Sequence, residues 1–120
     1  MNLKTFRVYD QEEHAMYYRG CWLSNTGKVV HPEVGEISRP VIEWVVPDVT
    51  DCNGDYIFEG DIIDATLRNT GEELKDLVVA YDSGAWVGRK DGKAWLLQDL
   101  DRIVAMWDIH KEQQQMEEME

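Results

Sequence analysis

Residues 77–97 read LVVAYDSGAWVGRKDGKAWLL, in which three runs of β-forming residues are separated by two short turn signals. Val, Leu, Tyr and Trp favour strands, and the segments Asp82-Ser83-Gly84 and Lys90-Asp91-Gly92-Lys93 are typical of tight turns between antiparallel strands. The stretch therefore predicts a three-stranded antiparallel meander.

The segments on either side extend this meander. Upstream, residues 63–68 alternate apolar and polar side chains, which places an apolar row on one face of a strand. Downstream, a turn or single helical turn at 98–101 precedes a similar alternation over 103–109. Five short strands in this order predict an SH3-like small barrel over residues 60–110. We expect its core to contain Ile63, Leu67, Val79, Trp86, Trp95, Leu97, Ile103 and Trp107.

Residues 1–59 carry weaker β signals. They predict short N-terminal strands forming a hairpin or meander, a loop-rich segment, and a strand over 41–46 that ends at the following proline. Asn53-Gly54 predicts a type I′ hairpin turn, because both residues tolerate a positive φ. Residues 111–120 lack β-forming residues and predict a short acidic helix or tail. The fold class we expect is mainly β, with the N-terminal elaboration joined to the barrel.

The composition excludes several classes of protein. A hydrophobic content of 43% is too high for a disordered chain, and a charged content of 30% is too high for a membrane protein. The net charge of −12 opposes direct binding to nucleic acid. No charged start followed by an apolar run opens the chain, so we expect a cytoplasmic protein that has no contact with a membrane.

The acidic residues concentrate in two blocks. Between Pro40 and Leu67 there is no Lys or Arg, and the carboxylates of that segment give a charge of −7. Residues 94–120 add −5. If the central block steers a basic partner toward the protein, its exposed carboxylates are the contact residues. The candidate partner-binding residues are Asp48, Asp51, Asp55 and Asp64.

The central block also resembles part of a calcium-binding loop, because Asp51, Asn53 and Asp55 occupy alternate positions. The rest of that pattern is missing, since Tyr56 stands where the loop requires Gly and Ile62 stands where it requires a bidentate Glu. We interpret the segment as a hairpin turn whose short polar side chains bind their own backbone.

Catalytic patterns are equally weak in the sequence. A hydrolase site needs carboxylates that converge, whereas Asp61 and Asp64 fall on opposite faces of a strand. Cys21 has no His at a defined spacing, and Cys21 and Cys52 lack the spacing of a zinc site. We therefore expect reduced structural thiols, no metal and no cofactor. The five tryptophans fit either a core or a recognition groove, and we favour the core for Trp86, Trp95 and Trp107.

Two stretches resemble the YopX-like family of phage and prophage proteins. Phe6-Arg7-Val8-Tyr9-Asp10 with Met16 is similar to the family's FRVWD…M start. Residues 51–63, DCNGDYIFEGDII, resemble its D-x-NG-x-x-I-(Y/F)-EGD-I-(I/V) signature. Residues 81–85 and 107–109 resemble later segments in the same order, so the similarity spans most of the chain. Before the NG pair the family commonly has Thr-Gly-Leu, where this chain has Pro-Asp-Val-Thr.

The resemblance implies a mainly β protein encoded by a phage or prophage, acting in a bacterial host, with no established reaction or cofactor. It also gives the EGD segment a structural role, in which Gly60 permits a bend, Asp61 ties the turn and Ile63 begins the core row. The structural turn residues are thus expected to be Asn53, Gly54, Gly60 and Asp61.

Three functions remain open on the sequence. The preferred one is a non-enzymatic phage accessory protein that binds an unknown protein partner or assembles with itself, and we expect a homo-oligomer because short sheets leave edges open to pairing. The alternative is an acidic mimic of nucleic acid that inhibits a host DNA-binding protein. The third, which the sequence supports least, is a metal-dependent hydrolase.

Overall fold

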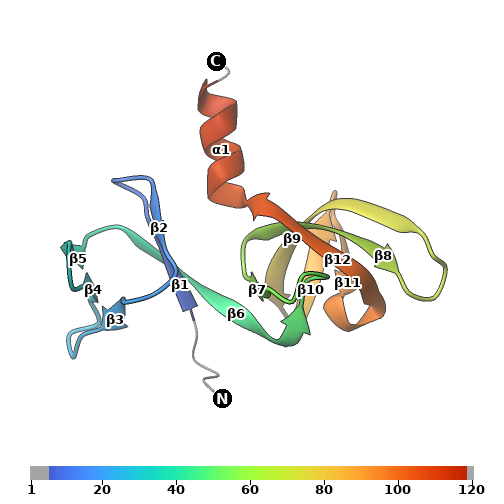
Figure 1. The fold of residues 1–120 in the computed structure, drawn as a ribbon, viewed down its shortest axis with the longest axis horizontal. Coiled ribbons are helices and arrows are strands. Elements are labelled where there is room, and N and C mark those ends of the chain that lie inside the picture. Colours follow the sequence, from blue (N-terminus) through green and yellow to red (C-terminus); the bar gives the residue numbers. More distant parts are fainter. Residues whose placement is uncertain (1–5, 119–120) are drawn as a thin grey trace. The chain divides into compact units, whose positions relative to one another are not determined.

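The computed structural model describes residues 6–118 and is mainly β, as the sequence predicts (Figure 1). The chain divides into two units, Met1–Val45 and Val46–Glu120. This division falls earlier in the chain than the expected boundary between residues 59 and 60. The long strand β6 (Pro40–Thr50) contributes its first half to the first unit and its second half to the second.

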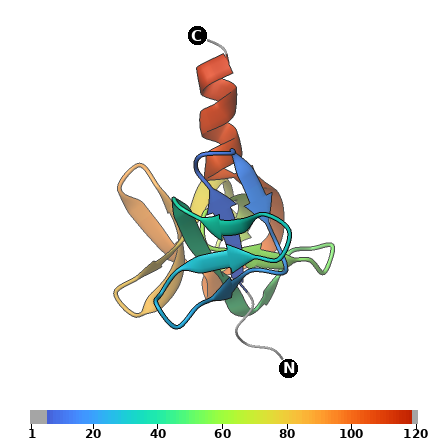
Figure 2. The same cartoon turned by 90° about the vertical axis from the view of Figure 1, so that its left-hand side faces the viewer.

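Antiparallel strands build the first unit. β1 (Phe6–Asp10) pairs with β2 (Ala15–Tyr17) and, on its other edge, with residues 40–44 of β6. A small three-stranded sheet of β3 (Trp22–Leu23), β4 (Val29–His31) and β5 (Gly35–Ile37) follows, and it faces the viewer in Figure 2. The loop-rich segment therefore holds more strand than expected. Its strands are too short for propensity to reveal.

A small apolar cluster and a buried ion pair form the core of the first unit. Val8, Val29 and Ile37 are buried together. On the opposite face of the β1–β6 pair, the direct cross-strand partners Arg7 and Glu43 form an ion pair with 2.9 Å between Nε and Oε1, and both side chains are almost fully buried. The Arg7 guanidinium also lies over the ring of Tyr18, 5.8 Å from its centroid.

A curled five-stranded sheet dominates the second unit, with the strand order β11-β10-β9-β8-β12. Every neighbouring pair in this sheet is antiparallel. The elements after β6 are β7 (Tyr56–Phe58), β8 (Asp61–Leu67), β9 (Glu73–Asp82), β10 (Ala85–Lys90), β11 (Lys93–Leu96), the 3₁₀ turn η1 (Leu97–Asp99), β12 (Leu100–Asp108) and α1 (Ile109–Glu118). The helical turn and the short C-terminal helix both match the sequence prediction.

Seven of the eight predicted core residues pack together in the second unit. Four of them, Ile63, Val79, Leu97 and Ile103, are fully buried, and Leu67, Trp86 and Trp95 pack against them half-buried. Gly88 is part of this packing, because a Cβ at that position would lie only 3.0 Å from Cδ1 of Leu77. The same core takes Val46 from β6 and Ile57 from β7.

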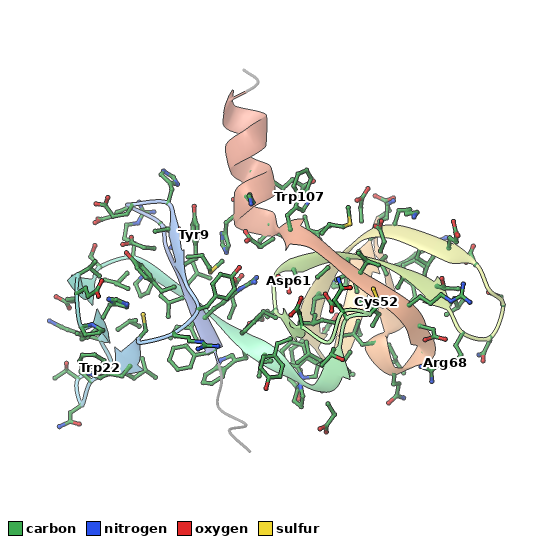
Figure 3. All side chains as sticks on the ribbon, in the orientation of Figure 1. Tyr9, Trp22, Cys52, Asp61, Arg68 and Trp107 are labelled. Carbon is green, nitrogen blue, oxygen red and sulfur yellow. The ribbon has the colours of Figure 1, made fainter. Side chains whose placement is uncertain are left out.

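The prediction for Trp107 is wrong, because this side chain is 39% exposed. Its strand has register shifts between Asp101 and Val104 and again between Ala105 and Trp107. A bulge inserts an extra residue and reverses the alternation beyond it, so Trp107 leaves the core face. Figure 3 labels Trp107 at the end of β12, next to the start of α1.

Two further local predictions require correction. β6 continues through Pro47 to Thr50, and the φ of 61° at Asp48 marks an irregularity of the kind in which a strand tolerates proline. The Asn53-Gly54 turn is not type I′, because only Gly54 has a positive φ, at 83°. Type I′ turns need a positive φ at both central residues, and that condition is met instead at Ser83-Gly84 and Asp91-Gly92.

Candidate functional site

The hairpin between β6 and β7 is organised by Asp51, which is only 7% exposed. Its Oδ1 accepts hydrogen bonds from the backbone N–H groups of Asn53 and Asp55, both at 2.9 Å, and its backbone N–H donates to the carbonyl of Asp55 at 2.9 Å. The loop therefore holds three residues and ends in the left-handed Gly54. The interpretation of this segment as a self-capped turn is confirmed. Asp51 serves the turn and is not the exposed partner contact that we expected.

The next turn, Glu59-Gly60, joins β7 to β8. Gly60 has a φ of 89°, which favours glycine, and its backbone donates to the carbonyl of Val79 and accepts from the N–H of Ile109, both at 2.9 Å. Oδ2 of the buried Asp61 accepts a hydrogen bond from the N–H of Phe58 at 2.9 Å. Gly60 thus bends the chain, and Asp61 ties the turn.

The other candidate partner-binding residues are dispersed. Asp48 and Asp55 are exposed. Asp64 is half-buried, accepts a hydrogen bond from the N–H of Asp76 at 3.0 Å, and lies 3.6 Å from Nζ of Lys75. Within residues 6–118 no three His, Cys, Asp or Glu side chains come together in a way that could hold a metal ion.

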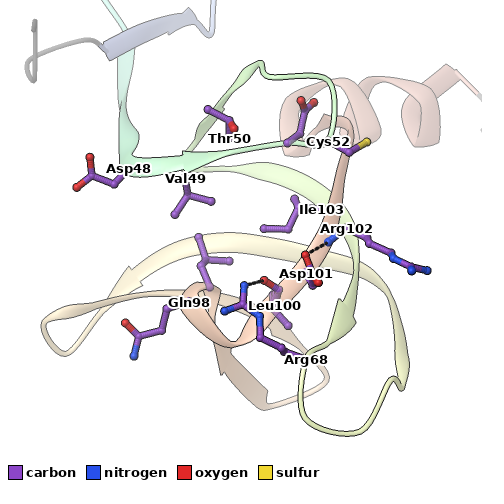
Figure 4. A pocket seen from close by; sticks show the side chains of 12 residues that line it. Asp48, Val49, Thr50, Cys52, Arg68, Gln98, Leu100, Asp101, Arg102 and Ile103 are labelled. Atoms are coloured by element: carbon purple, nitrogen blue, oxygen red, sulfur yellow. Dashed lines mark hydrogen bonds between the residues drawn. The ribbon is translucent and has the colours of Figure 1, made fainter.

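An open groove of about 560 Å³ lies in the second unit, between the end of β6 with its hairpin and the segment from η1 into β12 (Figure 4). The side chains of Val49, Leu97 and Ile103 supply apolar surface, and Ile103 and Leu97 belong to the buried core. Two of the sequence candidates line it. The full lining is Asp48, Val49, Thr50, Asp51, Cys52, Arg68, Leu97, Gln98, Leu100, Asp101, Arg102 and Ile103.

Opposite charges with unusual backbone conformations flank this groove. Asp48 in β6 has a φ of 61°, and Arg102 in β12 has a φ of 51°. A left-handed conformation costs free energy for a residue with a Cβ, more for a long side chain than for Asp. Arg102 adopts it at the first register shift of β12, where its N–H donates to Oδ1 of Asp101 at 3.0 Å. Such strain is found disproportionately at functional sites.

A further charged residue of the groove, Arg68, is held by its neighbours. Its Nη2 donates to the carbonyl of Leu100 at 3.2 Å, and its backbone N–H donates to the carbonyl of Asp99 at 2.9 Å. These bonds fix the start of β12 against the end of β8 and present part of the guanidinium to the groove. The sequence gives no signal for Arg68 or Arg102, because they come to the same groove as Asp48 only when distant segments meet.

The groove holds no pair of a nucleophile and a general base. Cys52 is exposed and its N–H donates to the carbonyl of Ile103 at 2.8 Å, but none of the three histidines lines the groove. His14 Nδ1 instead lies 3.1 Å from the hydroxyl of Tyr9, in the first unit. Burial raises the pKa of the Cys21 thiol, which keeps that group protonated and weakly nucleophilic near neutral pH.

Comparisons with known proteins give no relative for this chain: no family model matches it, no curated protein is significantly similar, and no solved structure matches. Among the described residues, no helix has the length and apolar character needed to cross a membrane.

Proposed function

We propose that the protein is a non-enzymatic interaction module whose groove binds an extended segment of a partner protein. The resemblance of residues 6–10 and 51–63 to YopX-like proteins supports a phage or prophage origin and a role in the cytoplasm of a bacterial host. The sheet order β11-β10-β9-β8-β12, with a 3₁₀ turn before the last strand, supports an SH3-like barrel for the second unit. Fold alone does not supply the function, so the proposal depends on the groove.

The observation that carries the proposal is the pair Asp48 and Arg102. Both have a left-handed backbone without being glycine, both are exposed, and they lie on the two segments that flank one groove with a partly apolar lining. Glycine would relieve this strain at both positions. Side chains of opposite charge beside apolar surface suit a peptide, which offers both charged groups and apolar side chains.

The alternative function, an acidic mimic of nucleic acid, has less support from this structure, because a mimic needs one continuous exposed surface of carboxylates. Glu43, Asp51 and Asp61 are buried. Glu59 and Asp64 are half-buried, and Asp64 has Lys75 as a neighbour, which leaves Asp48 and Asp55 as the fully exposed acids of the central block. The hydrolase would need these carboxylates to converge, and the groove contains only two of the seven, Asp48 and Asp51.

The test separates the cost of strain from the gain of binding. In the double variant Asp48→Gly, Arg102→Gly, relief of the left-handed conformations raises the free energy of unfolding by about 1 kcal/mol, while partner capture falls. The control variant Ser83→Gly relieves the strain of a non-glycine residue at a φ of 52° outside the groove. It should gain stability and keep the partner. Capture from host lysate is compared by quantitative mass spectrometry for the parent and both variants. If the double variant captures the same proteins in the same amounts as the parent, the groove is not the binding site.

A further inference from the structure

A second surface lies on the outer face of the hairpins β9-β10-β11, away from the groove lining. Strand register places six side chains there in two cross-strand rows, because cross-strand partners point to the same face and residues two apart share a face. Core residues such as Val79 and Trp95 occupy the alternate positions of the same strands. The rows are Leu96-Val87-Ala80 and Ala94-Arg89-Val78.

This outer face is partly apolar and partly basic. Leu96 is 38% exposed and Ala94 is exposed, whereas Val78 and Ala80 are half-buried and Val87, between Leu96 and Ala80, is buried. A hollow of about 490 Å³ lies over part of the face. Its lining is Asp76, Val78, Ala80, Arg89, Lys90, Asp91 and Gly92.

The edge strand next to this face has regular geometry. β11 is the terminal strand of the five-stranded sheet, and no other strand pairs with its outer edge among the described residues. Its four register pairs with β10 run without interruption. The opposite edge, β12, has two register shifts, and bulges of this kind protect an edge from pairing with a foreign strand. Of the two edges, β11 is therefore the one suited to accept an added strand.

Positive charge gathers at the same end of the sheet, in a chain whose net charge is −12. Lys90 and Lys93 are direct cross-strand partners, an arrangement in which like charges repel, and Arg89 is the adjacent residue of β10. Two acids, Asp91 in the turn and Asp76, line the hollow together with Arg89 and Lys90 and oppose part of this charge. An acidic ligand is repelled by most of the protein and attracted here.

We propose that an acidic, extended peptide of a partner protein binds along the outer edge of β11 as an additional strand. Its backbone pairs with β11, and side-chain specificity comes from the outer face. A carboxylate next to Ala94 meets Arg89, because the small Ala94 side chain leaves room for the long guanidinium to reach across. An apolar side chain two residues along the peptide packs on the row that begins with Leu96.

The occupant is a foreign acidic peptide rather than a second copy of β11. The sequence of β11, KAWL, contains one lysine and no acid, so its pairing with itself lacks the charge that Arg89 and Lys93 require. This surface is separate from the groove, so the inference goes beyond the proposed function and either can fail alone.

The probe is the fluorescein-labelled hexapeptide Thr-Glu-Thr-Val-Thr-Glu, titrated with the full chain and followed by anisotropy. The double variant Arg89→Gln, Lys93→Gln should weaken binding by about tenfold or more, because it removes the charge-assisted contact of Arg89 and the positive charge that Lys93 adds to this end of the sheet. The control variant Lys28→Gln, Lys111→Gln makes the same change in net charge at exposed sites elsewhere and should stay within about twofold. A peptide N-methylated at alternate residues should lose binding, because it cannot form the backbone ladder.

Three outcomes overturn the proposal. The first is equal affinity of the parent and the Arg89, Lys93 variant for the peptide. The second is equal affinity for a peptide in which both Glu residues are replaced by Lys. The third is a dimer in sedimentation experiments that the substitution Leu96→Lys abolishes, because the face is then occupied by a second copy.

Discussion

The two units achieve burial in different ways. In the second unit nine buried apolar residues form one continuous cluster among the described residues. In the first unit the corresponding cluster has three buried members, and Arg7 and Glu43 form a buried ion pair on the opposite face of the β1–β6 pair. The short strands of the first unit enclose little apolar surface and also bury a charged pair. The attraction between the two charges offsets the desolvation cost of burying each of them. The comparison predicts that the first unit depends on one ion pair, whereas the second depends on distributed apolar packing.

The largest expected effect comes from breaking that pair. Arg7→Ala should lower the free energy of unfolding by about 3–5 kcal/mol, because the Glu43 carboxylate loses its guanidinium while buried. Urea denaturation measures the loss. The double variant Arg7→Met, Glu43→Leu removes both charges and should recover most of the stability. A loss below about 1 kcal/mol for Arg7→Ala would contradict the dependence of the first unit on this pair.

The substitution Trp107→Ala tests the second unit. Because the side chain is exposed, its removal should lower the free energy of unfolding by less than about 1 kcal/mol, as at other surface positions. The matched control Leu77→Ala, at a fully buried position, should cost about 2–5 kcal/mol through the cavity it leaves. Thermal denaturation followed by circular dichroism compares the two variants. Equal losses of stability would show that Trp107 is part of the core.

The smallest effect concerns the two thiols, one in each unit. Cys21 packs against the core of the first unit and its pKa is raised above the ordinary value of 9.0 by burial, whereas Cys52 is exposed. Cys52 should therefore react first with a thiol reagent, as measured in Cys21→Ser and Cys52→Ser variants. Because the folded chain holds the Cys21 proton more tightly, its contribution to stability is present below pH 9.0 and declines as the pH rises through the folded pKa. A Cys21 thiol that titrates below 9.0 would contradict this assignment.

The sequence allowed the sheet of the second unit to be predicted because its signals are local. Ser83-Gly84 and Asp91-Gly92 each supply a two-residue turn with positive φ, and the strands between them alternate regularly. The error at Trp107 has the opposite origin, since a bulge shifts the register without any sequence signal that we recognised. Asn53-Gly54 was placed correctly as a turn, but the side chain of Asp51 selected a three-residue loop.

The candidate site could be predicted only in part. Asp48 and Asp51 were expected to serve a partner because they lie in an acidic block, and both line the groove, although Asp51 is committed to its turn. Arg68 and Arg102 come from other parts of the chain and carry no local motif. Their place in the same groove as Asp48 depends on the pairing of β8 with β12 and on the hydrogen bond from the Cys52 N–H to the Ile103 carbonyl, which no window of the sequence contains.

That pairing also determines the order in which the second unit should fold. The turns at 83–84 and 91–92 join neighbouring strands, so these hairpins close within about microseconds. The pairing of β8 with β12 instead brings Asp61 beside Asp108, which are the first and last residues of the five-stranded sheet along the chain. Such non-local closure is slow. We therefore expect the docking of β12 onto β8 to be the rate-limiting step of folding. Substitution of Ala105 by Gly, which weakens this strand, should then slow refolding in stopped-flow experiments.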